Sequence, residues 1–187
     1  PITINAPGGR VSLRGLTLKG ANALAALTLV AADSLSVEEV SFDRWTTGLD
    51  LLNTTGSRIA VANSTMVANA VGISDFNAGA GSQISITGVR FDRNSGAAMD
   101  IYAATTTVSD SVFVGNLNGL LVGPGSADVR NSAFWGNTNG ALISYPGGAL
   151  SLSRSHVFGN NGGLIANGGL VVRSEEHTSE LQSLAYL

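Results

Sequence analysis

The sequence predicts an all-β protein: a right-handed parallel β-helix, or solenoid, of about seven rungs of 21–25 residues each. Three observations predict this class. A pattern recurs about every two dozen residues, and short runs within each copy alternate between apolar and polar residues. No copy contains the ten or more residues of helical periodicity that a β–α unit needs. Parallel strands joined by crossover connections are expected to coil to the right.

The repeat is anchored on one apolar position in each copy. Successive anchors are 24, 24, 25, 22, 21 and 23 residues apart. Because a single rung leaves its apolar side uncovered and stacked rungs cover it, the anchors are expected to stack in one internal column. They are Leu18, Phe42, Met66, Phe91, Phe113, Phe134 and Val157.

Each copy predicts about three short strands. One lies before the anchor and alternates as in Ile84-Ser85-Ile86, the second contains the anchor, and the third follows a turn, as in Leu120-Leu121-Val122. Glycine occurs six residues after the anchor in five copies, which places a turn between the second and third strands.

Asparagine occupies the third position after the anchor in five of the seven copies. An amide both donates and accepts hydrogen bonds, so stacked copies are expected to form an asparagine ladder at this turn. This structural ladder comprises Asn69, Asn94, Asn116, Asn137 and Asn160.

Composition excludes several classes of protein. The chain has no cysteine, and therefore no disulfide, cysteine-bound zinc or thiol nucleophile. Its net charge of −3 and lack of a basic run argue against a nucleic-acid partner. No apolar run approaches the ~20 residues of a membrane span, so no transmembrane segment is expected.

Residues 1–172 resemble a known family. The run ITINAPGGRVSLRGLTLKG, followed by LSVEEVSFDRW, resembles the secreted or surface right-handed parallel β-helix repeat proteins of bacteria. It is more distantly similar to the fold shared by pectate lyases and polygalacturonases. The resemblance implies an extracellular or cell-surface location and a polysaccharide or a surface protein as partner.

Enzymes of that fold need clustered carboxylates, and lyases also need a basic residue and calcium. The sequence contains no Asn-Thr-Asp run, no Asp-Asp pair, no Gly-His-Gly and no Arg-Ile-Lys. One candidate cation or glycan site remains, at Asp50, Asp75 and Asp100, which are spaced by 25 residues. Asp50 is eight residues after its anchor and the other two are nine, so the register decides whether they share a face. Solvated surface carboxylates are the simpler interpretation.

Two tryptophans are candidates for stacking on a sugar ring. Trp45 and Trp135 lie near the same turn, three residues and one residue after their anchors. An exposed tryptophan can stack on a sugar, whereas a buried one would cover the end of the apolar column.

Residues 173–187 break the pattern. RSEEHTSELQS has no anchor, no apolar alternation and no turn glycine, although it could form a short helix that caps the solenoid. It corresponds codon by codon to the translation of a common short-read sequencing adapter. We therefore interpret residues 173–187 as an artefact and residues 1–172 as a β-helix fragment, with ten acidic and nine basic residues.

The sequence favours a non-catalytic secreted or cell-surface solenoid that is structural, adhesive or glycan-binding, with no cofactor. The alternative is a polysaccharide lyase or glycoside hydrolase of the β-helix type that is truncated in this fragment, and only this alternative would call for calcium. The alternative requires the three aspartates to point outward on one sheet, opposite an arginine or lysine. A passive spacer is a third hypothesis.

Overall fold

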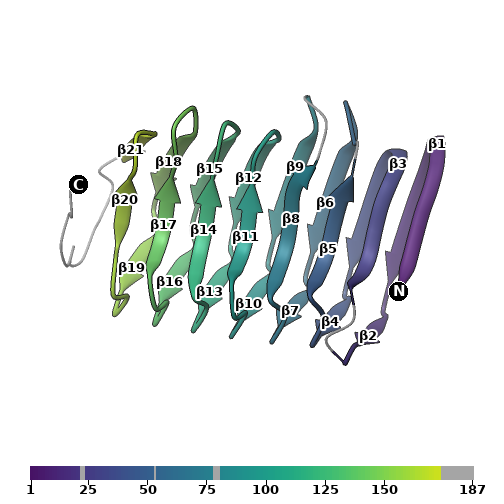
Figure 1. The fold of residues 1–187 in the computed structure, drawn as a ribbon, viewed down its shortest axis with the longest axis horizontal. Helices are drawn as coiled ribbons and strands as arrows, with labels where there is room; N and C mark the ends of the chain where they lie inside the picture. Colours follow the sequence, from purple (N-terminus) through teal and green to yellow (C-terminus); the bar gives the residue numbers. More distant parts are fainter. Residues whose placement is uncertain (22–23, 53, 78–80, 174–187) are drawn as a thin grey trace.

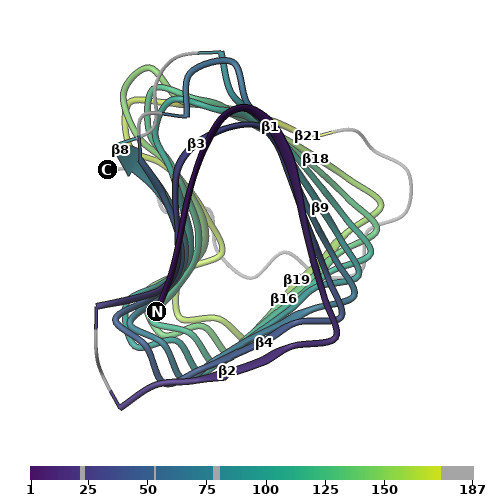
Figure 2. The same ribbon diagram turned by 90° about the vertical axis from the view of Figure 1, so that its right-hand side faces the viewer.

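The computed structural model describes residues 1–21, 24–52, 54–77 and 81–173. These residues form a right-handed parallel β-solenoid of about seven turns, with strands and turns and no helix in the part described. Figure 1 shows the turns side by side along the long axis, and Figure 2 shows the solenoid from one end. The predicted fold class is therefore confirmed. Of the segment 173–187, interpreted from the sequence as an artefact, Arg173 is the last residue of β21 (Leu170–Arg173), and residues 174–187 lie outside the described residues.

Two long strands run through two sides of the solenoid. They are β1 (Ile2–Arg14) and β3 (Ala25–Glu38), and their register shifts near Ala6 and Arg10. In later turns the same path is divided into two shorter strands, because a turn of three to five residues separates them. The first and second sheets are therefore continuous through β1 and β3 and count together as 14 strands.

The first sheet contains the beginning of these two strands and one strand from each later turn. The later strands are β5 (Thr47–Leu52), β8 (Val71–Asn77), β11 (Ala97–Ile101), β14 (Asn118–Val122), β17 (Gly140–Ser144) and β20 (Leu164–Ala166).

The second sheet contains the later part of β1 and β3. It continues through β6 (Arg58–Ala62), β9 (Gln83–Thr87), β12 (Thr105–Ser109), β15 (Ser126–Arg130), β18 (Ala149–Ser153) and β21 (Leu170–Arg173).

The third sheet has seven strands of three residues each. They are β2 (Thr17–Lys19), β4 (Ser41–Asp43), β7 (Thr65–Val67), β10 (Arg90–Asp92), β13 (Val112–Val114), β16 (Ala133–Trp135) and β19 (His156–Phe158).

The seven anchors are the middle residues of these third-sheet strands, and all seven pair in register. The five from Phe42 to Phe134 are completely buried. The ring of Phe113 stacks on that of Phe91 at 4.7 Å and on that of Phe134 at 4.3 Å between centroids. The predicted internal column is therefore present, and it forms the third-sheet wall of the core.

The five asparagines form a continuous hydrogen-bonded series beside this column. Nδ2 of each of the first four donates to Oδ1 of the asparagine in the next rung, at 2.8–3.2 Å, and Nδ2 of Asn160 donates to the carbonyls of Phe134 and Phe158. The backbone N–H of each of the first four donates to the same Oδ1, at 2.9–3.1 Å. Trp45 occupies the corresponding position one rung earlier, and its backbone N–H donates to Oδ1 of Asn69 at 3.0 Å. The series satisfies amide groups that the turn would otherwise bury without partners.

Both corners of the third sheet use left-handed backbone. The corner before each third-sheet strand always has two residues, and the first of them has a positive φ in every rung. These residues are Gly15, Glu39, Asn63, Gly88, Asp110, Asn131 and Arg154. A matching residue follows six of these strands, and it is not glycine at Arg44, Ala68 and Arg93. The non-glycine residues with a positive φ have a strained backbone, so the stacking of the rungs must hold these corners in place.

Candidate functional site

Two of the three predicted aspartates share a face of the first sheet. Asp50 on β5 and Asp100 on β11 both pair in register with Ser74 on the strand between them. All three side chains are half-buried. Asp50 and Asp100 therefore lie about two rung spacings apart, roughly 9.6 Å, with a serine hydroxyl between them.

Asp75 does not join them, because it points into the solenoid. Its side chain is completely buried. Its carboxylate accepts hydrogen bonds from the backbone N–H groups of Tyr102, Ala103 at 3.3 Å and Ala104 at 2.9 Å. Asp75 therefore holds the turn of the next rung between the first and second sheets.

An extra turn residue explains why the spacing of 25 was misleading. The turn before β8 has three residues after its third-sheet strand, whereas the turn before β11 has four. Asp100 therefore moves into the column of Asp50, and Asp75 is left on the inner face. The expected site of three carboxylates is not formed. Among the residues that the structure describes, no group of three or more His, Asp or Glu side chains could hold a metal ion.

Burial affects the protonation of these aspartates. It raises the pKa of Asp50, and burial together with the charge of Asp75 raises the pKa of Asp100 to about 6. Burial also raises the pKa of Asp75, although the three amide hydrogen bonds oppose this effect. Within the described residues, neither Asp50 nor Asp100 forms an ion pair with an arginine or lysine.

The two tryptophans have different environments. Trp45 is only 6% exposed, and its Nε1 donates to the backbone carbonyl of Leu18 at 3.0 Å. The prediction that Trp45 could stack on a sugar is therefore wrong, because its ring belongs to the core. Trp135 is 40% exposed and lies parallel to Phe158, with ring centroids 6.2 Å apart. These two rings form an exposed aromatic pair on the third sheet.

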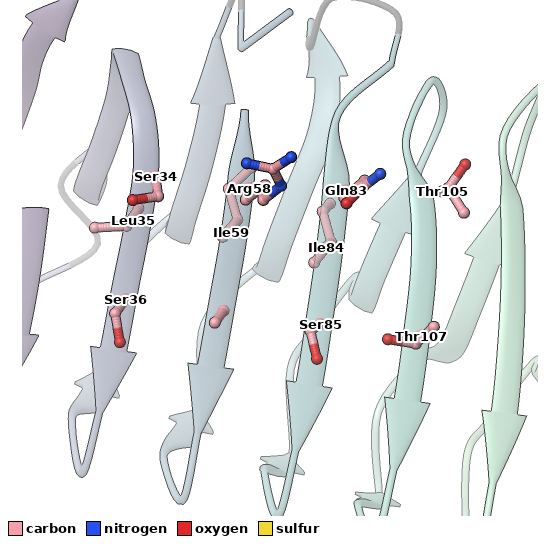
Figure 3. A pocket seen from close by; sticks show the side chains of 11 residues that line it. Ser34, Leu35, Ser36, Arg58, Ile59, Gln83, Ile84, Ser85, Thr105 and Thr107 are labelled. Atoms are coloured by element: carbon pink, nitrogen blue, oxygen red, sulfur yellow. The ribbon is translucent and has the colours of Figure 1, made fainter. Parts of the chain in front are cut away.

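A hollow on the outer face of the second sheet was not predicted. It has a volume of about 370 Å³ and extends over β3, β6, β9 and β12 (Figure 3). Serine and threonine hydroxyls, the amide of Gln83 and the guanidinium of Arg58 surround it. The outward lining residues are Ser34, Ser36, Arg58, Ala60, Gln83, Ser85, Thr105 and Thr107.

The lining residues stand in two columns that run along the solenoid axis. Ser34, Arg58, Gln83 and Thr105 pair in register as one column, at the first residue of β6, β9 and β12 and within the later part of β3. The second column runs two residues further along each strand (Figure 3). The hollow therefore offers an extended ligand at least one polar side chain on each of four successive rungs, with Ala60 as the one apolar residue of the two columns.

The sequence carried a signal for this hollow. The residues of its first column lie eight positions before the anchor in each copy. The floor of the hollow, between the two columns, is formed by the buried apolar residues of the apolar–polar alternation in each strand. Those floor residues are Leu35, Ile59 and Ile84. The signal was weak because the outward positions carry different polar residues in each rung.

Comparison with known proteins finds no matching protein-family model and no matching curated relative. The class that fold and surface define is a parallel β-solenoid with a hollow on one sheet, in which polar side chains stand over an apolar floor. Within the described residues, no helix is long and apolar enough to cross a membrane.

Proposed function

We propose that this chain is a non-catalytic, secreted or cell-surface β-solenoid that binds a polysaccharide along the outer face of its second sheet. The observation that carries the proposal is the hollow of about 370 Å³ across four rungs. Sugars are recognised by hydroxyl, amide and guanidinium groups that hydrogen-bond to their hydroxyls, and those groups line this hollow.

The repetition of the fold supports an extended ligand. Successive rungs are about 4.8 Å apart, so the four rungs that line the hollow span roughly 14 Å between the first and the last. A linear polymer can follow such a surface along the axis and meet polar groups at regular intervals. The resemblance of residues 1–172 to secreted and surface β-helix repeat proteins supports the location.

Binding is preferred to lyase or hydrolase activity because of the aspartates. The enzyme hypothesis requires Asp50, Asp75 and Asp100 on one face, with a basic residue opposite. Asp75 is instead buried and hydrogen-bonded to the backbone of the next rung. The hollow on the second sheet, by contrast, contains no carboxylate among its lining residues.

The test is affinity electrophoresis of the full chain through gels that contain neutral or acidic polysaccharides. Ser85→Leu fills the middle of the hollow and removes a hydroxyl. Ser151→Leu is the matched control, because Ser151 stands in the same outward column, three rungs away and outside the hollow. We expect Ser85→Leu to weaken retardation about tenfold, the effect of losing roughly one hydrogen bond, and Ser151→Leu to leave it unchanged. Retardation by no polysaccharide, or equal losses in both variants, would contradict the proposal.

A further inference from the structure

Two arginines lie in one column on the second sheet. Arg10 on β1 pairs in register with Ser34 on β3, which pairs with Arg58 on β6. The two arginines are exposed and are therefore two rung spacings apart, roughly 9.6 Å, on either side of a serine. Arg58 lines the hollow, and Arg10 lies one strand beyond its edge.

These two arginines differ from most others in the chain because they have no counterion. Five arginines form ion pairs with carboxylates of the same or a neighbouring rung: Arg14, Arg44, Arg90, Arg93 and Arg130. Within the residues that the structure describes, Arg10 and Arg58 have neither an ion pair nor a side-chain hydrogen bond. Their ten N–H donors are therefore free to bind a ligand.

Four carboxylates lie near these arginines: Glu38, Glu39 and Asp128 are paired with other arginines, whereas Asp33, next to Ser34 on β3, is exposed and has no ion pair within the described residues. Glu38 and Glu39, at the far end of the second sheet, are engaged by Arg14, at 3.7 and 3.1 Å. Asp128 stands in the second column beyond the hollow and is paired with Arg130. Two unpaired guanidinium groups against the one carboxylate of Asp33 leave a net positive charge at the end of the hollow near β1 and β6, although the chain as a whole is negative.

We propose that the ligand of this hollow is an acidic polysaccharide that carries its anionic group on alternate sugar units. This inference rests on the proposed function and names the ligand class. A guanidinium binds carboxylate or sulfate through two parallel hydrogen bonds, so each arginine is suited to one anionic group. One pyranose unit of an extended chain is about as long as one rung spacing. Anionic groups two units apart can then meet both arginines, while the neutral unit between them faces Ser34.

Polymers of other charge spacing fit less well. A polymer with an acid on every unit would place an anionic group opposite Ser34, where the column offers no cation. Further along the same column, Gln83 and Thr105 are uncharged and suit neutral hydroxyls. The column therefore favours an alternating polymer over both a neutral one and a fully charged one.

The experiment is isothermal titration calorimetry on the full chain with four probes of matched length. They are an alternating polymer of glucuronate and N-acetylglucosamine, a polymer of galacturonate alone, a neutral glucan, and a single-stranded oligonucleotide. The variants are Arg10→Gln and Arg58→Gln, alone and together. Arg154→Gln is the control: it makes the same charge change at another arginine without an ion pair, at a corner outside the hollow.

We expect the alternating polymer to bind most tightly. Each single variant should weaken its binding about tenfold, as expected for the loss of one charged hydrogen-bonded pair, and the control should not. Raising the salt concentration should weaken wild-type binding and have little effect on the double variant. Binding that ranks the neutral glucan or the galacturonate polymer first, or that ignores both arginines, would overturn this inference and leave the proposed function standing. Equal binding of the oligonucleotide would also overturn it. Binding to none of the polysaccharides would overturn both.

Discussion

Replacing Asn116 by leucine should break the asparagine ladder at its centre. Asn116 is completely buried. Its Oδ1 accepts from the backbone N–H of Asn94 at 3.0 Å and from Nδ2 of Asn94 at 2.8 Å. Its Nδ2 donates to the carbonyl of Phe91 at 3.2 Å and to Oδ1 of Asn137 at 3.0 Å. Leucine has a similar size and provides none of these bonds.

The magnitude follows from which partners keep another bond. Nδ2 of Asn94 still donates to the carbonyl of Met66, and Oδ1 of Asn137 still accepts from the backbone N–H of residue 116. The backbone N–H of Asn94 and the carbonyl of Phe91 each lose a partner. The carbonyl of Phe91 keeps its partner in the ladder between β10 and β13, so only the N–H of Asn94 is left unsatisfied. A buried polar group left unsatisfied costs about 1–3 kcal/mol, which predicts a loss of about 2 kcal/mol in the free energy of unfolding.

The assay is guanidinium-induced unfolding of the full chain, followed by far-ultraviolet circular dichroism. The control is Asn118→Leu, two residues along, where a half-buried amide makes one hydrogen bond, at 3.5 Å to the carbonyl of Gly96. The control should change stability by less than about 0.5 kcal/mol. Equal midpoints for the two variants would refute the reasoning, because the ladder would then contribute nothing beyond filling space.

Three further predictions concern single residues. Phe113→Ala removes the middle ring of the stacked phenylalanines and should lower the free energy of unfolding by about 3–5 kcal/mol. Met66→Leu in the same column is the control and should lower it by less than about 1.5 kcal/mol. Denaturant unfolding measures both. Ala68→Gly relieves a φ of 55° and should raise the thermal midpoint, with a gain of about 1 kcal/mol; an unchanged or lower midpoint would mean that the corner is not strained. The pKa of Asp100 rises from 3.8 to about 6 on folding, so the folded state retains a proton that the unfolded state releases. Stability should therefore fall as pH rises from about 4 to about 6. Asp100→Asn should reduce that slope and leave the part that comes from the raised pKa values of Asp50 and Asp75. Asp75→Asn should lower the pKa of Asp100 in a carboxyl NMR titration.

The core could be predicted from the sequence because it repeats. The anchors and asparagines stand at constant positions within each copy, and the corner before the third sheet always has two residues. Stacking of the rungs then aligns equivalent residues of successive copies, so a repeat in the sequence predicts a column of side chains in the structure.

The candidate sites were harder to predict because they depend on the two corners of variable length. The corner before β11 has one residue more than the corner before β8. Asp100 therefore faces outward, whereas Asp75, at the same distance from its anchor, faces inward. In a strand, a shift of one residue moves every side chain to the other face. Arg10 and Arg58 lay at the same distance before their anchors, but two arginines among varied polar residues are not a recognisable motif.

Winding the chain into rungs has a consequence for its reach. Fully extended, the two dozen residues of one rung would span about 75 Å, whereas the wound rung advances the solenoid by about 4.8 Å. The solenoid is thus roughly fifteen times shorter than the extended chain, and it has a wide surface instead. A surface of this kind is ordered before any contact is made. Under the proposed function, only the polymer would lose conformational freedom on binding, and the protein would lose little.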